Sequence, residues 1–294
     1  MEKIQAAIAK ARATRQQPLQ HPAASAAPSS AAGPVVSPKL ADPADTTLPD
    51  AAEAAAAVDA LWAALPGFVP KTAQLNRAHV VTFAGGAQAV AFDGLRTKLL
   101  QQMRANNWRR LAITSPGAGC GKSMLAMNLA FGLARQPDLR TLLIELDLRR
   151  PSLEKALGIN APLTFARVLE GKAAFEDHVL RFGANLAIAT NQSPTRHPAE
   201  LLSSPTTATV LAEIEARYAP DVVIFDMPPM LVTDDTMAFA TQVDCALIVA
   251  AAEASTVKEI DICERELASQ TNVVGVVLNK CRYLDRGYGY GYYN

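Results

Sequence analysis

Residues 111–123, Leu-Ala-Ile-Thr-Ser-Pro-Gly-Ala-Gly-Cys-Gly-Lys-Ser, constrain the fold of this chain more than any other segment does. A short apolar run, typical of a buried strand, enters a glycine-rich turn that is followed by residues with good helix propensity. Glycines let successive backbone N–H groups curl round an anion, and the helix N-terminus adds a favourable dipole. The segment therefore predicts a strand, a phosphate-binding loop and a helix, with Lys122 reaching the phosphates of a nucleotide and Ser123 ligating Mg²⁺.

One position of this loop departs from the strict phosphate-loop pattern, because Pro116 stands where the pattern has its first glycine. Gly117 and Gly119 supply backbone freedom inside the loop instead. A glycine-rich turn without a ligand is the alternative interpretation, and the strand–loop–helix context disfavours it. The residues predicted to contact a nucleotide through the loop are Gly117, Ala118, Gly119, Cys120, Gly121, Lys122, Ser123 and Met124.

Short apolar runs alternate with helical segments from about residue 79 onward. The expected strands are 79–83, 110–114, 141–146, 186–189, 221–225, 244–250 and 273–278. The expected helices include 88–105, 121–136, 206–218 and 257–269. Strands alternating with helices imply right-handed βαβ units, and unbroken apolar runs indicate strands covered on both faces. We therefore expect an α/β fold of the P-loop NTPase type, a doubly wound, mostly parallel sheet with helices on both faces and its site at the carboxyl ends of the strands.

Acidic residues follow two of these strands, and a phosphate loop needs carboxylates opposite it to hold Mg²⁺. Glu145 and Asp147 are two residues apart, so an extended backbone would point both side chains to one side. Asp226 ends the run Val-Val-Ile-Phe, which is the arrangement of a Walker B aspartate. The two aspartates at 234–235 follow in a loop and are expected to be solvated or capping. Asn279 leaves the last strand, where a carboxamide can bond to the edge of a nucleotide base.

The rest of the chain divides by composition. A helix-spaced segment with four basic residues begins it, as in helices that dock on a partner or on anionic lipid. A stretch rich in Ala and Pro cannot bury enough apolar surface to fold, and an apolar stripe on the next helix, at Val58, Leu61, Trp62 and Leu65, indicates packing on a larger domain. The expected parts are a basic helix at 1–17, a disordered linker at 18–49, a short helix and connector at 50–78, the α/β domain at 79–282 and a flexible tail at 283–294.

Composition also excludes several classes of protein. Lys+Arg and Asp+Glu both number 28, which argues against a globally basic nucleic-acid binder, and no nucleic-acid partner is expected. The four Cys show no C-x-x-C spacing, which disfavours a metal finger or a disulfide framework and favours a reducing cytosol. No apolar run approaches the ~18 residues of a membrane span, and the N-terminus lacks the apolar core of a signal peptide. We therefore expect a cytoplasmic protein.

Five of the six tyrosines lie in the last twelve residues. Alternating glycines keep such a tail flexible, so it can enter the active site of another subunit, which a packed tyrosine cannot do. A Gly/Tyr-rich tail used only for stacking is the alternative, and the phosphate loop favours a substrate tail over it. The candidate phosphoacceptors are Tyr283, Tyr288, Tyr290, Tyr292 and Tyr293.

Several motifs together resemble those of the bacterial tyrosine kinases, or BY-kinases, the cytoplasmic partners of polysaccharide chain-length-determinant proteins. They are Thr114-Ser115 with Gly121-Lys122-Ser123, the run Glu145-Leu146-Asp147-Leu148-Arg149-Arg150-Pro151, the run Phe225-Asp226-Met227-Pro228-Pro229, and Pro198-Ala199-Glu200-Leu201-Leu202. The terminal tyrosine cluster matches as well, and the resemblance covers residues 79–294.

The resemblance implies an ATP- and Mg²⁺-dependent protein-tyrosine autokinase that phosphorylates the C-terminal tyrosines of a neighbouring subunit and regulates exopolysaccharide production or export. It implies self-association, and recruitment to the inner face of the cytoplasmic membrane by a membrane chain-length-determinant protein. The implied residue roles are phosphate and metal binding by Lys122 and Ser123, metal binding by Asp147 and Asp226, and proton acceptance from tyrosine by Glu145. Arg149 and Asn279 are also predicted to contact the nucleotide.

Two features depart from the family pattern. The family has Asp where this chain has Glu145, and the extra methylene is expected to slow a reaction that depends on positioning. The family's ring-assembly motif E-x-x-R-x-x-R reads Val90, Asp93 and Arg96 here, so only its last Arg survives. Both favour, as an alternative, a weakly active ATP-binding scaffold. A further alternative is a non-kinase ATPase switch similar to partition or Min-type proteins, although Gly117 stands at the position of their signature lysine.

Overall fold

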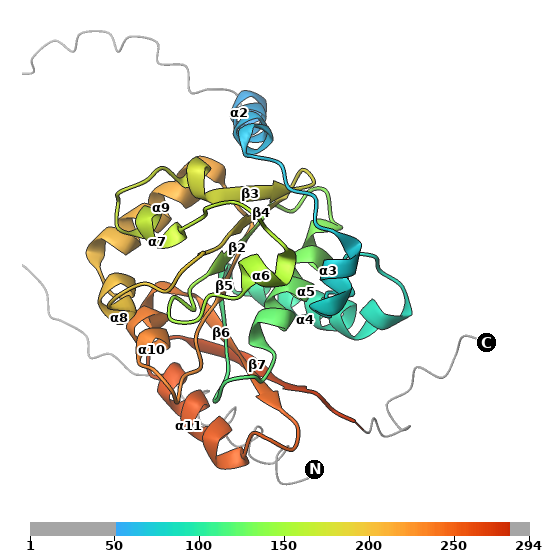
Figure 1. Cartoon of the computed structure of the whole chain (residues 1–294), viewed down its shortest axis with the longest axis vertical. Helices are drawn as coiled ribbons and strands as arrows, with labels where there is room; N and C mark the ends of the chain where they lie inside the picture. Colours follow the sequence, from blue (N-terminus) through green and yellow to red (C-terminus); the bar gives the residue numbers. More distant parts are fainter. Residues whose placement is uncertain (1–50, 283–294) are drawn as a thin grey trace, which may run out of the picture. The chain divides into compact units, whose positions relative to one another are not determined.

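The computed structural model describes residues 51–282. The basic helix expected at 1–17, the linker at 18–49 and the tyrosine tail at 283–294 therefore lie outside the described residues. Within that range, seven strands and the helices around them form the α/β architecture expected from the alternating pattern (Figure 1). In the same range, no helix combines the length and the apolar character needed to cross a membrane.

A central sheet runs through the domain in the order β3-β4-β2-β5-β1-β6-β7. Its strands are β1 (Arg110–Thr114), β2 (Thr141–Glu145), β3 (Val179–Phe182), β4 (Leu186–Ala189), β5 (Val222–Asp226), β6 (Cys245–Ala251) and β7 (Asn272–Asn279). Every neighbouring pair is parallel except β3 and β4. The chain passes from β1 to β2 on one side of β1 and later from β5 to β6 on its other side, which opens a crevice at the carboxyl end of β1. The prediction of a mostly parallel, doubly wound P-loop NTPase sheet is confirmed.

Two apolar cores lie on the opposite faces of this sheet. Val223 and Phe225 of β5 belong to one core, and Val222 and Ile224 belong to the other, so the strand is buried on both sides. The helices that contribute to the core with Phe225 are α2 (Ala51–Ala64), α7 (Phe165–Leu169), α8 (Pro198–Leu202), α9 (Pro205–Tyr218), α10 (Asp235–Phe239) and α11 (Val257–Ala268). Those that contribute to the core with Ile224 are α3 (Thr72–Arg77), α4 (Val90–Ala105), α5 (Lys122–Ala134) and α6 (Leu153–Leu157). In Figure 1, helices α7 to α11 lie on one side of the strands and helices α3 to α6 on the other.

Residues 79–83, expected to form a strand, form turns instead. His79, the first residue of this segment, has φ 55°, in the left-handed region, so the segment does not begin as extended backbone. The side chain of Asn128 on α5 satisfies the segment, because its Oδ1 accepts from the backbone N–H of Val81 at 2.9 Å and of Thr82 at 3.2 Å. The hydrogen bonds that a neighbouring strand would supply therefore come from a helix side chain, and the strand prediction is wrong here.

The strand β3 is not predicted by the sequence pattern. It is four residues long, contains Arg181 and pairs antiparallel with β4 at the edge of the sheet through a turn at Gly183, whose φ is 61°. The chain that follows α2 covers its outer edge, since Arg181 N–H donates to the carbonyl of Pro66 and Phe68 N–H donates to the carbonyl of Arg181, both at 2.7 Å. A short edge hairpin with a charged residue leaves no apolar run from which to predict it.

The apolar stripe expected on the helix before the domain packs against the core. Trp62 and Leu65 are buried, while Val58 and Leu61 are half-buried beside them. The indole Nε1 of Trp62 donates a 2.7 Å hydrogen bond to the carbonyl of Tyr218 at the end of α9, so its polar atom is satisfied inside the core. Together, these contacts attach α2 to the α/β domain.

Candidate nucleotide-binding site

The phosphate loop joins β1 to α5, as its sequence predicts. Thr114 ends the strand and donates its hydroxyl to the carbonyl of Pro228 at 2.7 Å, and the Ser115 hydroxyl donates to the carbonyl of Gly117 at 2.8 Å. Gly119 and Gly121 have φ of 76° and 95°, values that side chains disfavour. Glycine is therefore required at both positions to turn the loop into the N-terminus of α5.

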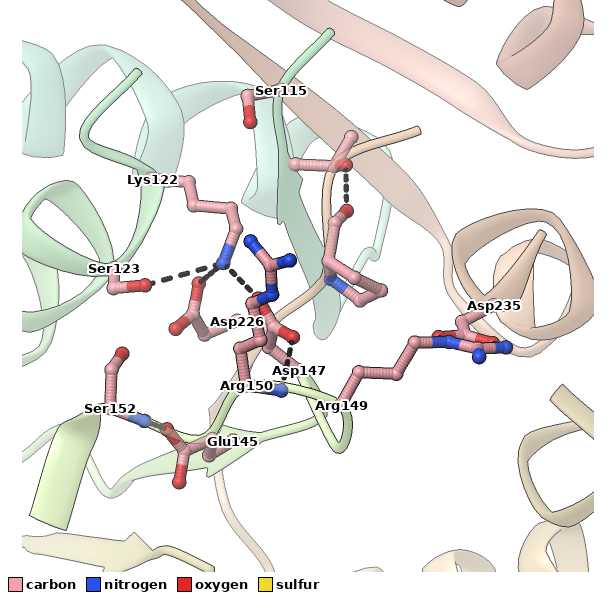
Figure 2. A network of polar contacts seen from close by, with 12 residues as sticks. Ser115, Lys122, Ser123, Glu145, Asp147, Arg149, Arg150, Ser152, Asp226 and Asp235 are labelled. Carbon is pink, nitrogen blue, oxygen red and sulfur yellow. Dashed lines mark hydrogen bonds and ion pairs between the residues drawn. The ribbon is translucent and has the colours of Figure 1, made fainter. Parts of the chain in front are cut away.

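Lys122 opens α5 and extends between two carboxylates (Figure 2). Its Nζ donates to Oδ2 of Asp147 at 2.8 Å and to Oδ1 of Asp226 at 3.5 Å, and it lies 3.4 Å from the hydroxyl of Ser123. Burial alone would lower the pKa of Lys122, but Asp226 and Asp147 outweigh it and raise that pKa above its ordinary value. The ammonium group is therefore held protonated at the head of the phosphate loop.

The register of the sheet brings the two carboxylates to this place. Glu145 on β2 is paired with Asp226 on β5, so both residues end adjacent parallel strands at the same edge of the sheet. The backbone N–H of Leu146 donates to the carbonyl of Asp226 at 2.9 Å, which continues the pairing by one step. Asp147 follows at once and turns its carboxylate to Lys122. Residues that are 104 positions apart in the sequence, Lys122 and Asp226, thus meet beside β1.

Oxygen ligands for a hydrated Mg²⁺ surround Lys122. The hydroxyl of Ser123 and the carboxylates of Asp147 and Asp226 all lie near its Nζ. The Oδ2 atom of Asp226 is buried and has no hydrogen-bond partner in the described structure, so it has lone pairs free for a metal-bound water. Among residues 51–282, no group of three or more His, Cys, Asp or Glu side chains is arranged to hold a metal ion. The donor set therefore fits an Mg²⁺ that also takes phosphate oxygens and waters as ligands.

Glu145 points elsewhere, and the expectation that it shares a side with Asp147 is wrong. Its side chain is fully buried and accepts hydrogen bonds from the backbone N–H groups of Ser152, Leu153 and Asn191. Figure 2 shows it directed to Ser152 and away from Lys122. Burial raises the pKa of Glu145 to about 7, although the three N–H donors oppose this effect. The backbone leaves the extended conformation after Glu145, where β2 ends, so the two-residue spacing does not place both carboxylates on one side.

Arg149 lines the site but is bound to α10. Its guanidinium makes two hydrogen bonds to Asp235, at 2.7 and 2.8 Å, and Asp234 lies 3.7 Å away. Asp235 is fully buried, so the expectation that it is solvated or capping is wrong. The fork geometry of this pair fixes the position of Arg149. Its contact with a nucleotide stays a prediction.

A cavity of about 890 Å³ opens beside Lys122. The predicted residues on its walls are Ala118, Gly119, Gly121, Lys122, Ser123, Met124, Asp147, Arg149 and Asn279. Glu145 and the buried Asp226 do not line it. Residues that sequence reasoning missed also form its walls, namely Arg77, His79, Phe92, Pro229 and Val232. The one sequence signal for this wall was Asn128, a polar residue within the otherwise apolar middle of α5, because its amide holds the segment that carries His79.

Three comparisons with known proteins show what this chain is similar to. Residues 107–288 match the ParA family model, NUBPL iron-transfer P-loop NTPase. The chain is 31% identical over 187 residues to the tyrosine-protein kinase YwqD of Bacillus subtilis, a span of 63% of this chain and 77% of YwqD. The kinase domain of the Escherichia coli tyrosine kinase ETK superposes with a TM-score of 0.61 at 28% identity, covering 70% of this chain and 80% of that one. With the tyrosine-protein kinase wzc of Salmonella typhi the identity is 31%, but the chain spans only 28% of that longer relative.

Proposed function

The chain belongs to the bacterial tyrosine kinase (BY-kinase) family, and on that premise we propose that it is an ATP- and Mg²⁺-dependent protein-tyrosine autokinase that acts in exopolysaccharide production or export. The observation that carries the proposal is the proximity of the Lys122 ammonium to Asp147 and Asp226 at the head of a phosphate loop. The proposed acceptors, on a neighbouring subunit, are Tyr283, Tyr288, Tyr290, Tyr292 and Tyr293.

Different groups at this site bind the phosphates and the metal. The backbone N–H groups at the start of α5 and the ammonium of Lys122 bind the phosphates of ATP. Phosphate oxygens would replace Asp147 and Asp226 as partners of that ammonium, which would leave both carboxylates available to hold Mg²⁺. Ser123, Asp147 and Asp226 then hold Mg²⁺ and its waters, and the ion neutralises charge on the phosphates when bound.

Phosphoryl transfer forms a bond between the tyrosine oxygen and the γ-phosphorus and breaks the bond to the bridging oxygen, which leaves as ADP. The tyrosine proton must pass to a base. Asp147 faces the cavity, whereas Glu145 is buried outside it. We therefore propose that the tyrosine proton passes to the carboxylate oxygen of Asp147 that does not hold the metal, and we remove the role of base from Glu145. Lys122 stabilises the charge that develops on the phosphoryl oxygens.

A weakly active ATP-binding scaffold is the second candidate, and contacts of α4 favour it. The surviving residue of the ring-assembly motif, Arg96, donates to the carbonyl of Gly132 at 2.9 Å and pairs with Asp93 at 3.0 Å. Asp93 also pairs with Arg135 on the following segment at 3.0 Å. These charged side chains are bonded within the subunit, so binding a neighbour would require them to exchange partners. A subunit that assembles poorly would present its tail to a partner rarely.

Transfer between subunits is tested by separating the active site from the tail. A subunit that lacks residues 283–294 is mixed with a full-length Lys122→Met subunit, ATP and Mg²⁺, and phosphotyrosine is mapped by mass spectrometry. Phosphate on the tail of the Lys122→Met subunit supports the kinase. If both the mixture and the parent protein hydrolyse ATP without forming phosphotyrosine, the result supports a non-kinase ATPase. If nucleotide binds but neither hydrolysis nor phosphotyrosine is detected, the result supports the ATP-binding scaffold.

We propose further that a membrane chain-length-determinant protein recruits the kinase to the inner face of the cytoplasmic membrane. The helical spacing of the apolar residues in segment 1–17, together with its four basic residues, supports this role for the segment. Deleting residues 1–17 is expected to reduce membrane recruitment in cells and to leave ATP affinity unchanged. Equal recruitment of the deleted and full-length proteins would contradict the role of that segment.

A further inference from the structure

We propose that Glu145 is a positioning residue, whose buried carboxylate closes the loop that carries Asp147 and thereby sets where Asp147 stands relative to Lys122. The inference deepens the proposed function and rests on the nucleotide site described above. It gives a role to the residue that departs from the family pattern and does not line the cavity.

The contacts of Glu145 use both of its oxygens. Oε1 accepts from the backbone N–H of Ser152 at 2.5 Å and from that of Leu153 at 2.8 Å, at the start of α6. Oε2 accepts from the backbone N–H of Asn191, after β4, at 2.9 Å. Hydrogen bonds to a carboxylate are among the stronger ones in a protein, and those from Leu153 and Asn191 are buried while that from Ser152 is partly buried. One side chain therefore joins the end of β2 to two other segments.

The loop between these anchors carries the charged residues of the site. Residues 146–151 leave β2 and return to the Glu145 carboxylate at Ser152, so the loop is closed on itself. Within it, Oδ1 of Asp147 accepts from the backbone N–H of Arg150 at 3.2 Å, while its Oδ2 faces Lys122. A shift at Ser152 therefore moves the segment that holds Asp147.

Asn191 completes the closure from the other side. Its Nδ2 donates to the carbonyl of Glu145 at 3.0 Å, and its Oδ1 accepts from the backbone N–H of Ala166 at 2.9 Å. The backbone and the side chain of Glu145 are thus both bonded to Asn191, which is itself fixed to α7. Contacts that orient a metal ligand commonly change metal affinity by ~10–100-fold when they are removed, and the contacts of Glu145 would act on Asp147 through the closed loop.

The length and the charge of the side chain both matter for these bonds. Aspartate would withdraw the carboxylate by about 1.5 Å, one C–C bond, which takes its oxygens beyond hydrogen-bonding distance of at least one anchor. Glutamine keeps the length but has one oxygen, so its NH₂ would face an N–H donor at Asn191 or at Ser152. Alanine removes all three bonds.

The test compares Glu145→Asp, Glu145→Gln and Glu145→Ala with the parent and with the matched control Glu154→Gln. Glu154 lies on α6 beside Leu153, and its carboxylate makes no hydrogen bond or ion pair in the described structure. Three measurements are made after thermal melting has established that each variant folds. They are amide hydrogen exchange at residues 146–153 and 191 without nucleotide or metal, the Mg²⁺ concentration for half-maximal binding of a fluorescent ATP analogue, and single-turnover tail labelling.

A positioning role predicts faster exchange at Ser152, Leu153 and Asn191 in the Asp and Ala variants, and at fewer of these amides in the Gln variant. The Mg²⁺ midpoint should rise by about tenfold or more in the Asp and Ala variants, with less change in Gln and none in the control. If Glu145 is instead the base, the Asp variant should keep tail labelling, and the Gln and Ala variants should lose it. Amide exchange and the Mg²⁺ midpoint should then stay at the parent's values in all three variants. That result overturns the proposal.

Two further outcomes separate this inference from the proposed kinase. If melting temperatures fall but folded variants keep the parent's Mg²⁺ midpoint, Glu145 is merely structural and the proposal is overturned. If the parent binds the analogue with Mg²⁺ but labels no tail, the kinase fails, while exchange and Mg²⁺ midpoints still decide the role of Glu145. If the parent does not bind the analogue, both fail.

Discussion

The Nδ2 atom of Asn279 donates a 2.8 Å hydrogen bond to the carbonyl oxygen of Cys120, and this bond fastens the end of the last strand to the phosphate loop. The next loop residue, Gly121, passes so close to the Asn279 amide that a Cβ at this position would collide with it. The expected contact of Asn279 was with the edge of a base. The observed bond indicates a second role for Asn279, which is to hold the phosphate loop in the conformation that binds phosphates.

Replacing Asn279 by Ala is therefore expected to weaken nucleotide binding. Loss of this partly buried hydrogen bond, about 1 kcal/mol, corresponds to roughly fivefold in affinity. The matched control is Asn272→Ala at the other end of β7, where Nδ2 donates to the carbonyl of Asp244 at 2.8 Å, far from the loop in sequence. Titration of a fluorescent ATP analogue measures both variants. An equal loss of affinity in the two would mean that Asn279 acts only through the stability of the strand.

Lys122→Met is expected to abolish tail phosphorylation nearly completely. The change removes the ammonium that lies 2.8 Å from Asp147 and that would stabilise the transferring phosphoryl group, so the rate should fall by about a hundredfold or more. Lys98→Met on α4 is the control, because Lys98 is exposed and lies outside the cavity walls. Single-turnover labelling of the tail with saturating ATP and Mg²⁺ gives both rates. If Lys122→Met labels the tail at the parent's rate, the assignment of Lys122 to the active site is wrong.

The core of the site could be predicted from sequence because its signals are local. The glycines of the loop, Lys122 and the aspartate at the end of a buried strand each depend on a few adjacent residues, and the sheet register then brings them together. Glu145 shows where such reasoning ends. Its spacing from Asp147 implies a shared side only while the backbone stays extended, and β2 ends at Glu145 itself.

The strand prediction for residues 79–83 failed for a different physical reason. Its Val-Val-Thr-Phe composition favours a strand, but a strand needs a neighbour with free backbone groups, and here Asn128 supplies the partners from a helix. Likewise, the burial of Asp235 depends on Arg149, which is 86 residues away. Contacts of this range leave no local pattern in one sequence. The wall of the cavity at Arg77 and His79 was missed for the same reason.

The interaction of Glu176 with Tyr218 predicts a pH dependence of stability. Burial raises the pKa of Glu176, but the 2.7 Å hydrogen bond from the Tyr218 hydroxyl and the charge of Arg217 outweigh it, so the pKa lies below its ordinary 4.5. A depressed carboxyl pKa stabilises the fold above the unfolded-state value, and this stabilisation is lost as pH falls through the folded-state value. Because Glu176 is partly exposed, we expect about 1 kcal/mol or less.

Glu176→Gln should therefore lower the urea midpoint at pH 7, and the difference from the parent should shrink as the pH falls below 4.5. The control is Glu213→Gln, which makes the same change at an exposed position of α9. A difference between Glu176→Gln and the parent that stays constant from pH 7 down to the acid transition would mean that the carboxylate contributes no charge-dependent stability.

The sixth tyrosine supplies an internal control for the tail. Tyr218 is buried at the end of α9, and its hydroxyl is bonded to Glu176, so it cannot enter an active site while the domain is folded. Burial raises the pKa of its hydroxyl, and the bond to Glu176 adds to that effect, which also makes it a poor nucleophile.

Changing the five tail tyrosines to Phe keeps their rings and removes their hydroxyls. Autophosphorylation should then disappear, while binding of a fluorescent ATP analogue stays at the parent's affinity because the loop and Lys122 are unchanged. Phosphopeptide mapping of the parent should place phosphate on the tail and none on Tyr218. Phosphate found on Tyr218, or on Ser and Thr in the five-Phe variant, would show that the tail is not the acceptor.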